Sequence, residues 1–300
     1  MPAPLPIRDG LNPTRIRMPE SIGEWATVVE YLASRFPRDA ASLHAKVTAG
    51  EVVDAAGRPL NLESPVVPRA DVFLYRDPPV EPVVPFGMDI LYRDDALVVV
   101  DKPHFLATTP RGRFVVQTAL TRLRRELGND ELSPAHRLDR LTAGVLIFTA
   151  RTDARRPYQE MFRERSVRKV YEAVAADSSI PFPRTVVSRI VKDRGSLQAV
   201  EVPGEPNSET VVEKVRTDGR LALYRLHPRT GKTHQLRVHM ASLGLPILGD
   251  SLYPTPHDIA ADDYSDPLRL LARNIAFVDP LTGEDRFFES GRRLEPFAFS

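Results

Sequence analysis

Residues able to do chemistry are most concentrated between Ala135 and Gly144, in the run Ala-His-Arg-Leu-Asp-Arg-Leu-Thr-Ala-Gly. A lone carboxylate, Asp139, lies there between Arg137 and Arg140. Nearby positive charge favours the ionised form of a carboxyl group. The apolar run Val145–Phe148 follows at once and predicts a buried strand. An ionised carboxylate is therefore expected on a turn at a strand end, where a nucleophile could act.

A second group of polar side chains occurs in the run Thr-Gly-Lys-Thr-His-Gln-Leu-Arg-Val-His, residues 230–239. The spacing of apolar residues from about Thr233 to Leu243 predicts a helix that ends at Gly244. On such a helix the apolar residues anchor one side, whereas His234 and Arg237 share another side. Arg237 is therefore able to point into a site.

A cation and an aromatic ring occur close together in the alternating segment Val167–Val174, which predicts a strand. The period of a strand places Lys169 and Tyr171 on the same face. A tyrosine on a strand is most often an ordinary core or surface residue. This pair therefore indicates a functional site only in combination with the other motifs.

These motifs resemble the RluA-type pseudouridine synthases, which isomerise uridine in RNA to its C-glycoside. Lys-x-Tyr and His-Arg-Leu-Asp-Arg-Leu-Thr-Ala-Gly match that family, and so does the 230–239 run, with Lys232 where the family has arginine. Three further stretches also resemble that family, namely Tyr92–Pro103, Leu243–Tyr253 and Leu271–Glu284. The resemblance covers about residues 90–290, in the family's order.

The resemblance implies a role for each matching residue. Asp139 would be the catalytic carboxylate, Arg237 would pair with it, and Tyr171 would stack on the flipped uracil and take part in removing the proton from C5. Arg137 would fill the space that the flipped base leaves in the RNA. Contact with RNA, or support of the pocket, would fall to Arg140, Lys169, Lys232, His234 and Gln235.

The implied reaction breaks the bond from C1′ to N1 and joins C1′ to C5, with no redox change. It requires neither a metal nor an organic cofactor. The sequence leaves open whether Asp139 attacks C1′, attacks C6 or drives a glycal route. It also leaves open whether the RNA partner is large-subunit ribosomal RNA or tRNA, and which uridine is modified.

Charge is unevenly distributed along the 300 residues, although the net charge is only +1. Residues 111–170 carry 14 basic and 7 acidic groups, whereas residues 1–110 carry 11 and 15. A local basic field suits an enzyme that acts on nucleic acid. The chain has no cysteine, which excludes disulfides and thiolate catalysis, and no apolar run of membrane-spanning length. We expect a cytoplasmic protein, with a monomer as the default.

Proline-rich segments divide the chain. We expect a tail over residues 1–20, a small degenerate S4-like domain over 21–76, a proline-rich linker over 77–88 and the catalytic domain over 89–300. The first helix of the small domain would begin at a capping box formed by Ser21 and Glu24. The expected fold class is α+β: a mixed, mainly antiparallel sheet with flanking helices, preceded by an S4-like or an unrelated α+β domain.

Two other functions compete with the synthase. A metal hydrolase could use His136, Asp139, His234 and His239 as ligands, although neighbouring arginines would repel a cation. Sensitivity to a chelator would separate it from a synthase. A non-catalytic RNA-binding protein could use the same basic face, and it would keep every activity in an Asp139→Asn variant.

Overall fold

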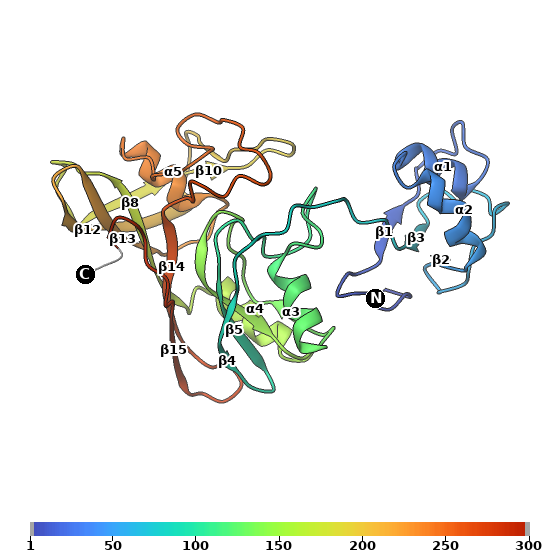
Figure 1. Cartoon of the computed structure of the whole chain (residues 1–300), viewed down its shortest axis with the longest axis horizontal. Helices are drawn as coiled ribbons and strands as arrows, with labels where there is room; N and C mark the ends of the chain where they lie inside the picture. The colour runs from blue at the N-terminus through green and yellow to red at the C-terminus, as the bar shows by residue number, and fades with distance from the viewer. Residues whose placement is uncertain (1–2, 298–300) are drawn as a thin grey trace. The chain divides into compact units, whose positions relative to one another are not determined.

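The computed structural model describes residues 3–297. Residues 1–2 of the expected tail and 298–300 of the expected catalytic domain lie outside the described residues. The chain divides into two compact units (Figure 1). The first contains the described residues up to Glu81 together with Arg111–Val116 and Arg124–Asp130. The second contains Pro82–Pro110, Gln117–Leu123 and the described residues from Glu131 onward.

The first unit packs two helices on a small antiparallel sheet whose strand order is β1-β3-β2. Its elements are β1 (Thr14–Arg17), α1 (Val28–Arg35), α2 (Ala40–Thr48), β2 (Val52–Asp54) and β3 (Asp71–Leu74). The expected tail therefore includes a strand, because Ile16 lies against the apolar core that contains Met18 and Val72. A four-residue strand beside prolines gives too short an alternation to stand out in the sequence.

The start of α1 differs from the sequence-based expectation. Its N-cap is Thr27, whose side-chain oxygen accepts a hydrogen bond from the Glu30 backbone N–H, while the Glu30 carboxylate accepts one from the Thr27 N–H. The prediction of a capping box at Ser21 and Glu24 was wrong. Both pairs have the required spacing of three residues, but only the second directly precedes the apolar positions that reach the core.

The second unit is built on a ten-stranded sheet with the path β4-β5-β7-β14-β8-β13-β12-β9. Strands β15 and β6 pair with β14 and β7, respectively. Only β7 and β14 run parallel among the described pairs, so the expectation of a mixed, mainly antiparallel sheet is confirmed. The strands are β4 (Asp89–Arg93), β5 (Leu97–Lys102), β6 (Ser133–Pro134), β7 (Ala143–Thr149), β8 (Arg168–Ala176), β9 (Arg184–Ser188), β12 (Ser208–Thr217), β13 (Leu221–Pro228), β14 (Leu270–Val278) and β15 (Asp285–Glu289).

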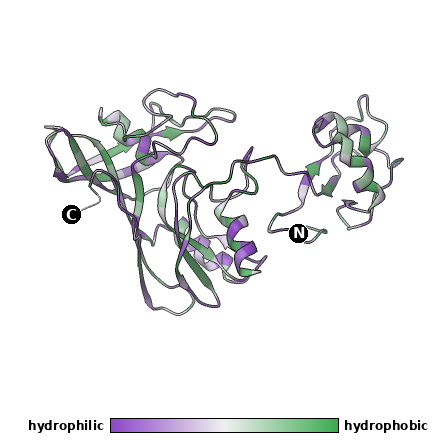
Figure 2. Cartoon of the chain, viewed as in Figure 1, coloured by the Kyte–Doolittle hydropathy of each residue, from purple (hydrophilic) through white to green (hydrophobic). Residues whose placement is uncertain are grey.

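Helices of the described chain flank this sheet: α3 (Ala119–Leu127), which contributes residues to both units, α4 (Arg155–Arg163) and α5 (Gln235–Ser242). A separate hairpin pairs β10 (Ile190–Val191) with β11 (Val200–Glu201). Every residue of β5 and β7 is buried, as expected of strands that are covered on both faces. Figure 2 shows hydrophobic residues gathered in the strands and hydrophilic residues on α3.

Gly144 fixes the crossing of β7 and β14. Its φ of +112° lies in a region that L-residues avoid, and a Cβ atom there would collide with the backbone of Ala272. The close approach allows the two strands to pair in parallel at Ala143 and Gly144. It also brings the turn before β7, which carries Asp139, beside the strands that line the site.

Candidate active site

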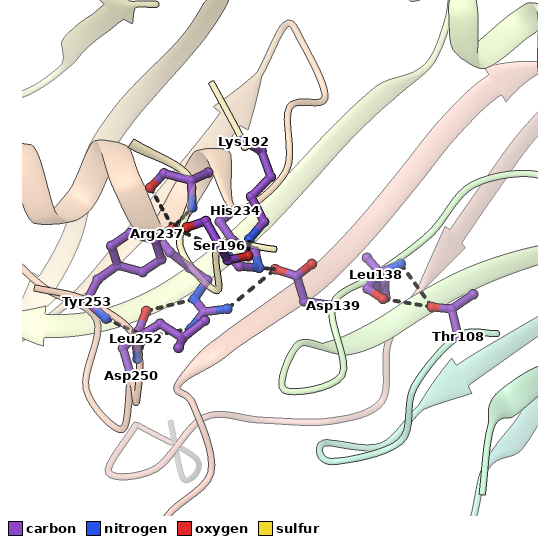
Figure 3. Close-up of polar contacts among 11 residues, drawn as sticks. Thr108, Leu138, Asp139, Lys192, Ser196, His234, Arg237, Asp250, Leu252 and Tyr253 are labelled. Carbon is purple, nitrogen blue, oxygen red and sulfur yellow. Dashed lines mark hydrogen bonds and ion pairs between the residues drawn. The ribbon is translucent and has the colours of Figure 1, made fainter. Parts of the chain in front are cut away.

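Asp139 lies on the loop between β6 and β7, at the edge of a cavity of about 540 Å³. Its side chain is 34% exposed. The preceding residue, Leu138, is buried, and both its backbone N–H and its carbonyl bond to the Thr108 hydroxyl, at 3.1 and 2.8 Å (Figure 3). This two-point attachment fixes the backbone immediately before the carboxylate.

Lys102, at the end of β5, holds the same loop from the protein interior. Its side chain is fully buried, and its ammonium donates to the carbonyl oxygens of Pro103, Leu106 and Arg140, at 2.9, 2.7 and 3.4 Å. Burial lowers the pKa of Lys102 to about 7, an effect that the negative charge of Asp139 opposes. The lysine therefore ties the turn after Asp139 to the core of the sheet.

Arg237 on α5 faces Asp139 with one nitrogen and holds another carboxylate with the other two (Figure 3). Its Nη1 lies 3.6 Å from Asp139 Oδ2, which brings together the pair that the family resemblance implies. Its Nε and Nη2 donate to Asp250, at 2.8 and 2.6 Å. Burial alone would lower the pKa of Arg237, but the hydrogen bonds and charge of Asp250 outweigh it, so the pKa lies above its usual value.

Asp250 is a site residue that the sequence reasoning missed. Its side chain is 1% exposed, and Oδ1 also accepts hydrogen bonds from the backbone N–H groups of Leu252 and Tyr253. A buried charge is stable only when it is paired and hydrogen-bonded, and Asp250 satisfies both conditions. The only signal in the sequence is its place in the family-like stretch Leu243–Tyr253, which says nothing about its partner.

His234 is the second cationic-type side chain that faces Asp139. It precedes α5 with a left-handed φ of +57°, and its Nε2 lies 3.9 Å from Asp139 Oδ2. Its Nδ1 is hydrogen-bonded to the Tyr253 hydroxyl at 3.0 Å, and the Tyr253 ring lies 5.3 Å from the Arg237 guanidinium. Burial lowers the pKa of His234, and the Asp139 carboxylate opposes that effect.

The cavity collects most of the residues that the sequence singled out. Besides Asp139, Arg237 and His234, it is lined by Arg137, Lys169, Tyr171, Lys232 and Gln235. Arg140 does not line it, and its guanidinium lies 5.9 Å from the centre of the Phe105 ring. Burial and the nearby Asp139 carboxylate raise the pKa of Tyr171, so its phenol is neutral at physiological pH.

Gln235 supports the pocket from beneath. It is 4% exposed, and its amide nitrogen donates to the Glu209 carbonyl and the Thr210 hydroxyl. Its amide oxygen accepts from the Thr230 hydroxyl and the Lys232 backbone N–H. These four bonds engage the amide with the protein, which leaves it no hydrogen-bonding group for RNA.

Leu270, at the start of β14, is a second lining residue that the sequence reasoning missed. It is 3% exposed and gives the cavity an apolar wall near Tyr171, whose strand pairs with β14. No signal in the sequence separates this leucine from the other core leucines.

The ligands of the competing metal hydrolase do not converge in this site. His136 Nε2 accepts a hydrogen bond from the Ile147 N–H, and its ring stacks on Phe162. The two ring nitrogens of His239 bond to serine and threonine hydroxyls, namely those of Ser188, Ser208 and Thr210. Within residues 3–297, no three His, Asp, Glu or Cys side chains are arranged to hold a metal ion.

Known proteins are similar to this chain in sequence and in fold. Residues 96–242 match a family described as RNA pseudouridylate synthase. An uncharacterized RNA pseudouridine synthase of Synechocystis is 33% identical over 67% of this chain and 70% of its own. The dual-specificity RNA pseudouridine synthase RluA of Haemophilus influenzae is 32% identical over 71% of this chain and 95% of its own.

A solved structure agrees with these relatives. Human RNA pseudouridylate synthase domain containing 4 superposes with a TM-score of 0.54 and 29% identity, over 69% of this chain and 89% of its own. No helix among residues 3–297 has the length and apolar content to cross a membrane. The chain belongs to the RluA-type RNA pseudouridine synthase family, whose members are isomerases that convert uridine in RNA to pseudouridine.

Proposed function

We propose that Asp139 is the catalytic carboxylate of this synthase and that the target uridine is flipped into the 540 Å³ cavity. One observation carries the proposal: among the described residues that line the cavity, Asp139 is the only carboxylate. Attack on C1′, attack on C6 and elimination to a glycal all require one ionised carboxylate at the sugar or the base. Asp139 is the group that can supply it.

Arg237 positions this carboxylate in the proposal. Asp250 fixes the guanidinium at two points, so Nη1 has a defined direction toward Asp139. A charge held in place before substrate arrives needs no reorganisation during the reaction. Arg237 therefore keeps Asp139 aimed while the glycosidic bond breaks and re-forms.

Tyr171 would bind the flipped base, and Arg137 would fill the space that the base leaves. A base-modifying enzyme must unstack its target, which costs a few kcal/mol. The Tyr171 ring lines the cavity and offers a face on which uracil can stack, and stacking on an aromatic ring is worth about 1–3 kcal/mol per base. Arg137 is at the rim of the cavity, where its guanidinium can occupy the vacated space in the RNA.

The partner that this proposal implies is structured RNA, either ribosomal RNA or tRNA. The basic segment 111–170 supplies Arg137 and Lys169 to the cavity wall, and Lys232 is another of its cations. These groups can bind phosphates without reading a sequence. No metal or organic cofactor takes part in the proposed reaction.

We further propose that the first unit is a degenerate S4-like domain that orients the enzyme and does not grip RNA. Its two helices and short antiparallel strands support the likeness. Several of its cations are already paired: Arg15 and Arg17 bond to Asp71, and Lys46 bonds to Asp77. An Arg15→Gln/Arg17→Gln variant should bind RNA as tightly as the wild type, and a tenfold loss would show that the unit grips RNA.

Release of tritium tests the proposed function in vitro. RNA from cells that lack the gene, labelled with uridine tritiated at C5, loses tritium when C1′ rebonds to C5. The wild-type protein should release it with and without EDTA. Asp139→Asn should bind the RNA normally but release tritium at least about a thousandfold more slowly. Equal release by the two proteins would refute the role of Asp139.

A further inference from the structure

A second cavity, of about 590 Å³, adjoins the first and shares part of its wall. Four residues line both cavities, namely Arg165, Lys169, Pro228 and Arg229. The second cavity also reaches the outer face of β12, where Glu209, Val211 and Glu213 alternate with residues that point inward. Each cavity has the size of a small-ligand pocket, so the combined groove has room for more than one nucleotide.

Within the described part of the chain, three cations of the second cavity have no carboxylate partner. Arg165, Arg168 and Lys169 form no ion pair among residues 3–297, although all three line the second cavity. We call these three residues the cation cluster. The acidic residues of the second cavity lie beside other side chains of the same cavity: Glu209 bonds to Arg229 at 2.8 Å, and the Glu213 carboxylate lies 3.3 Å from His227 Nε2. The groove therefore keeps positive charge that the protein does not neutralise.

The cluster brings like charges close together. Lys169 is half-buried, and its pKa is lowered first by burial and then by the positive charge of Arg165. Both effects disfavour the charged lysine as long as no anion is bound. An anion bound between Lys169 and Arg165 would remove the repulsion.

The backbone at Arg165 gives independent support. This residue has a left-handed φ of +61° at the end of α4, where its N–H bonds to the Phe162 carbonyl and the Ser166 N–H bonds to the Met161 carbonyl. Glycine is the usual residue at such a helix end, because a Cβ atom is unfavourable there. The arginine side chain thus occupies a position that the backbone geometry alone would give to glycine.

We propose that the cation cluster binds the RNA backbone phosphate next to the target uridine, and that the second cavity takes the adjacent nucleotide. This inference rests on the proposed function. Arginine matches the geometry of a phosphate with paired N–H groups, and lysine adds a point charge. The Glu213 carboxylate repels phosphate, so the backbone stays on the cluster side while the base lies over Val211. Its oxygens can accept hydrogen bonds from a ribose hydroxyl or a base amino group.

Binding of a single-stranded probe tests the cluster without requiring activity. Fluorescein-labelled decauridylate is titrated with the full-length wild type and with Arg165→Gln/Lys169→Gln, by anisotropy over a range of NaCl concentrations. The double variant should bind about tenfold more weakly at low salt. In a plot of the logarithm of the binding constant against the logarithm of the NaCl concentration, the negative slope should be shallower by about 0.7 for the variant, because the protein neutralises one phosphate fewer.

The matched control is Arg151→Gln/Arg156→Gln, which removes two positive charges near and on α4, outside both cavities. These arginines pair with Asp153 and Glu160, respectively, and their side chains are 49% and 86% exposed. The control should keep the affinity and the salt slope of the wild type. Equal binding by the wild type and the cluster variant, or an equal loss in the control, would overturn the inference.

Steady-state kinetics on a substrate RNA separate this inference from the proposed function. The cluster variant should raise KM about tenfold with kcat within about twofold. A methylphosphonate at the linkage beside the target uridine should raise KM for the wild type and add nothing in the variant. If the enzyme is active but neither the double substitution nor the methylphosphonate changes its KM, the inference is overturned while the proposed function stands. If the wild type formed no pseudouridine but the cluster variant still lost its binding to decauridylate, the phosphate-binding role of the cluster would be upheld and the proposed function refuted.

Discussion

The guanidinium of Arg237 and the carboxylate of Asp250 form a two-point hydrogen-bonded pair, at 2.8 and 2.6 Å, and each side chain is at most 2% exposed. The third guanidinium nitrogen lies 3.6 Å from Asp139. Asp250 therefore determines where Arg237 directs its charge, although Asp250 does not line the cavity.

Replacing Asp250 should cost stability as well as activity. Asp250→Ala leaves a buried guanidinium without its partner, which typically lowers the free energy of unfolding by about 3–5 kcal/mol. Asp266→Ala, which removes a largely exposed partner of Arg269, should change it by less than about 1 kcal/mol. Urea unfolding of both variants checks the difference. Similar values for the two would mean that the buried pair is not a distinct stabilising unit.

Gly249 should tolerate no side chain. Its φ is +76°, and a Cβ atom would collide with the backbone carbonyl of Pro267. Gly249→Ala is expected to displace Asp250, lowering both the free energy of unfolding and kcat. Gly219→Ala is the control, since Gly219 has a φ of +92° with open space around it. The control pays only the backbone cost, about 1–2 kcal/mol. Equal losses in thermal unfolding would show that the collision is relieved.

Lys102 should make stability depend on pH. Its pKa is lowered to about 7 in the folded protein, whereas an unfolded lysine titrates near 10.4. Between these values the unfolded chain binds one more proton, so this residue's contribution to the free energy of unfolding rises with pH. The rise is at most about 1.4 kcal/mol per pH unit.

The measurement is the difference in free energy of unfolding between the wild type and Lys102→Met, taken from pH 7 to 9. Subtracting the variant removes the contribution of other groups that titrate in this range. The difference should move in favour of the wild type as the pH rises. A flat difference would contradict a buried lysine with a lowered pKa.

Local patterns predicted the main strands of the catalytic sheet, and the family resemblance predicted that Arg237 pairs with Asp139. The strand period at Lys169 and Tyr171, and the helix that carries Arg237, are set by neighbouring residues. Asp250 could not be found in this way. Its partner lies 13 positions away, and their meeting depends on the loop that Gly249 turns.

Arg140 shows that a residue close to Asp139 in the sequence can still lie outside the site. It is only one position from Asp139, but the turn at Asp139 and Thr142 places its side chain outside the cavity. Proximity in sequence therefore does not imply a shared site when a turn intervenes. The sequence also did not single out Arg165, which lines both cavities and has a left-handed backbone that the sequence does not mark.

Site-resolved mapping of pseudouridine in total RNA tests the central claim most directly. Cells that lack the gene are compared with the same cells carrying the wild type or Asp139→Asn, at matched protein levels. One or more sites should disappear with the gene and return only with the wild type, which would identify the RNA and the catalytic carboxylate together. Restoration of those sites by Asp139→Asn would contradict the account.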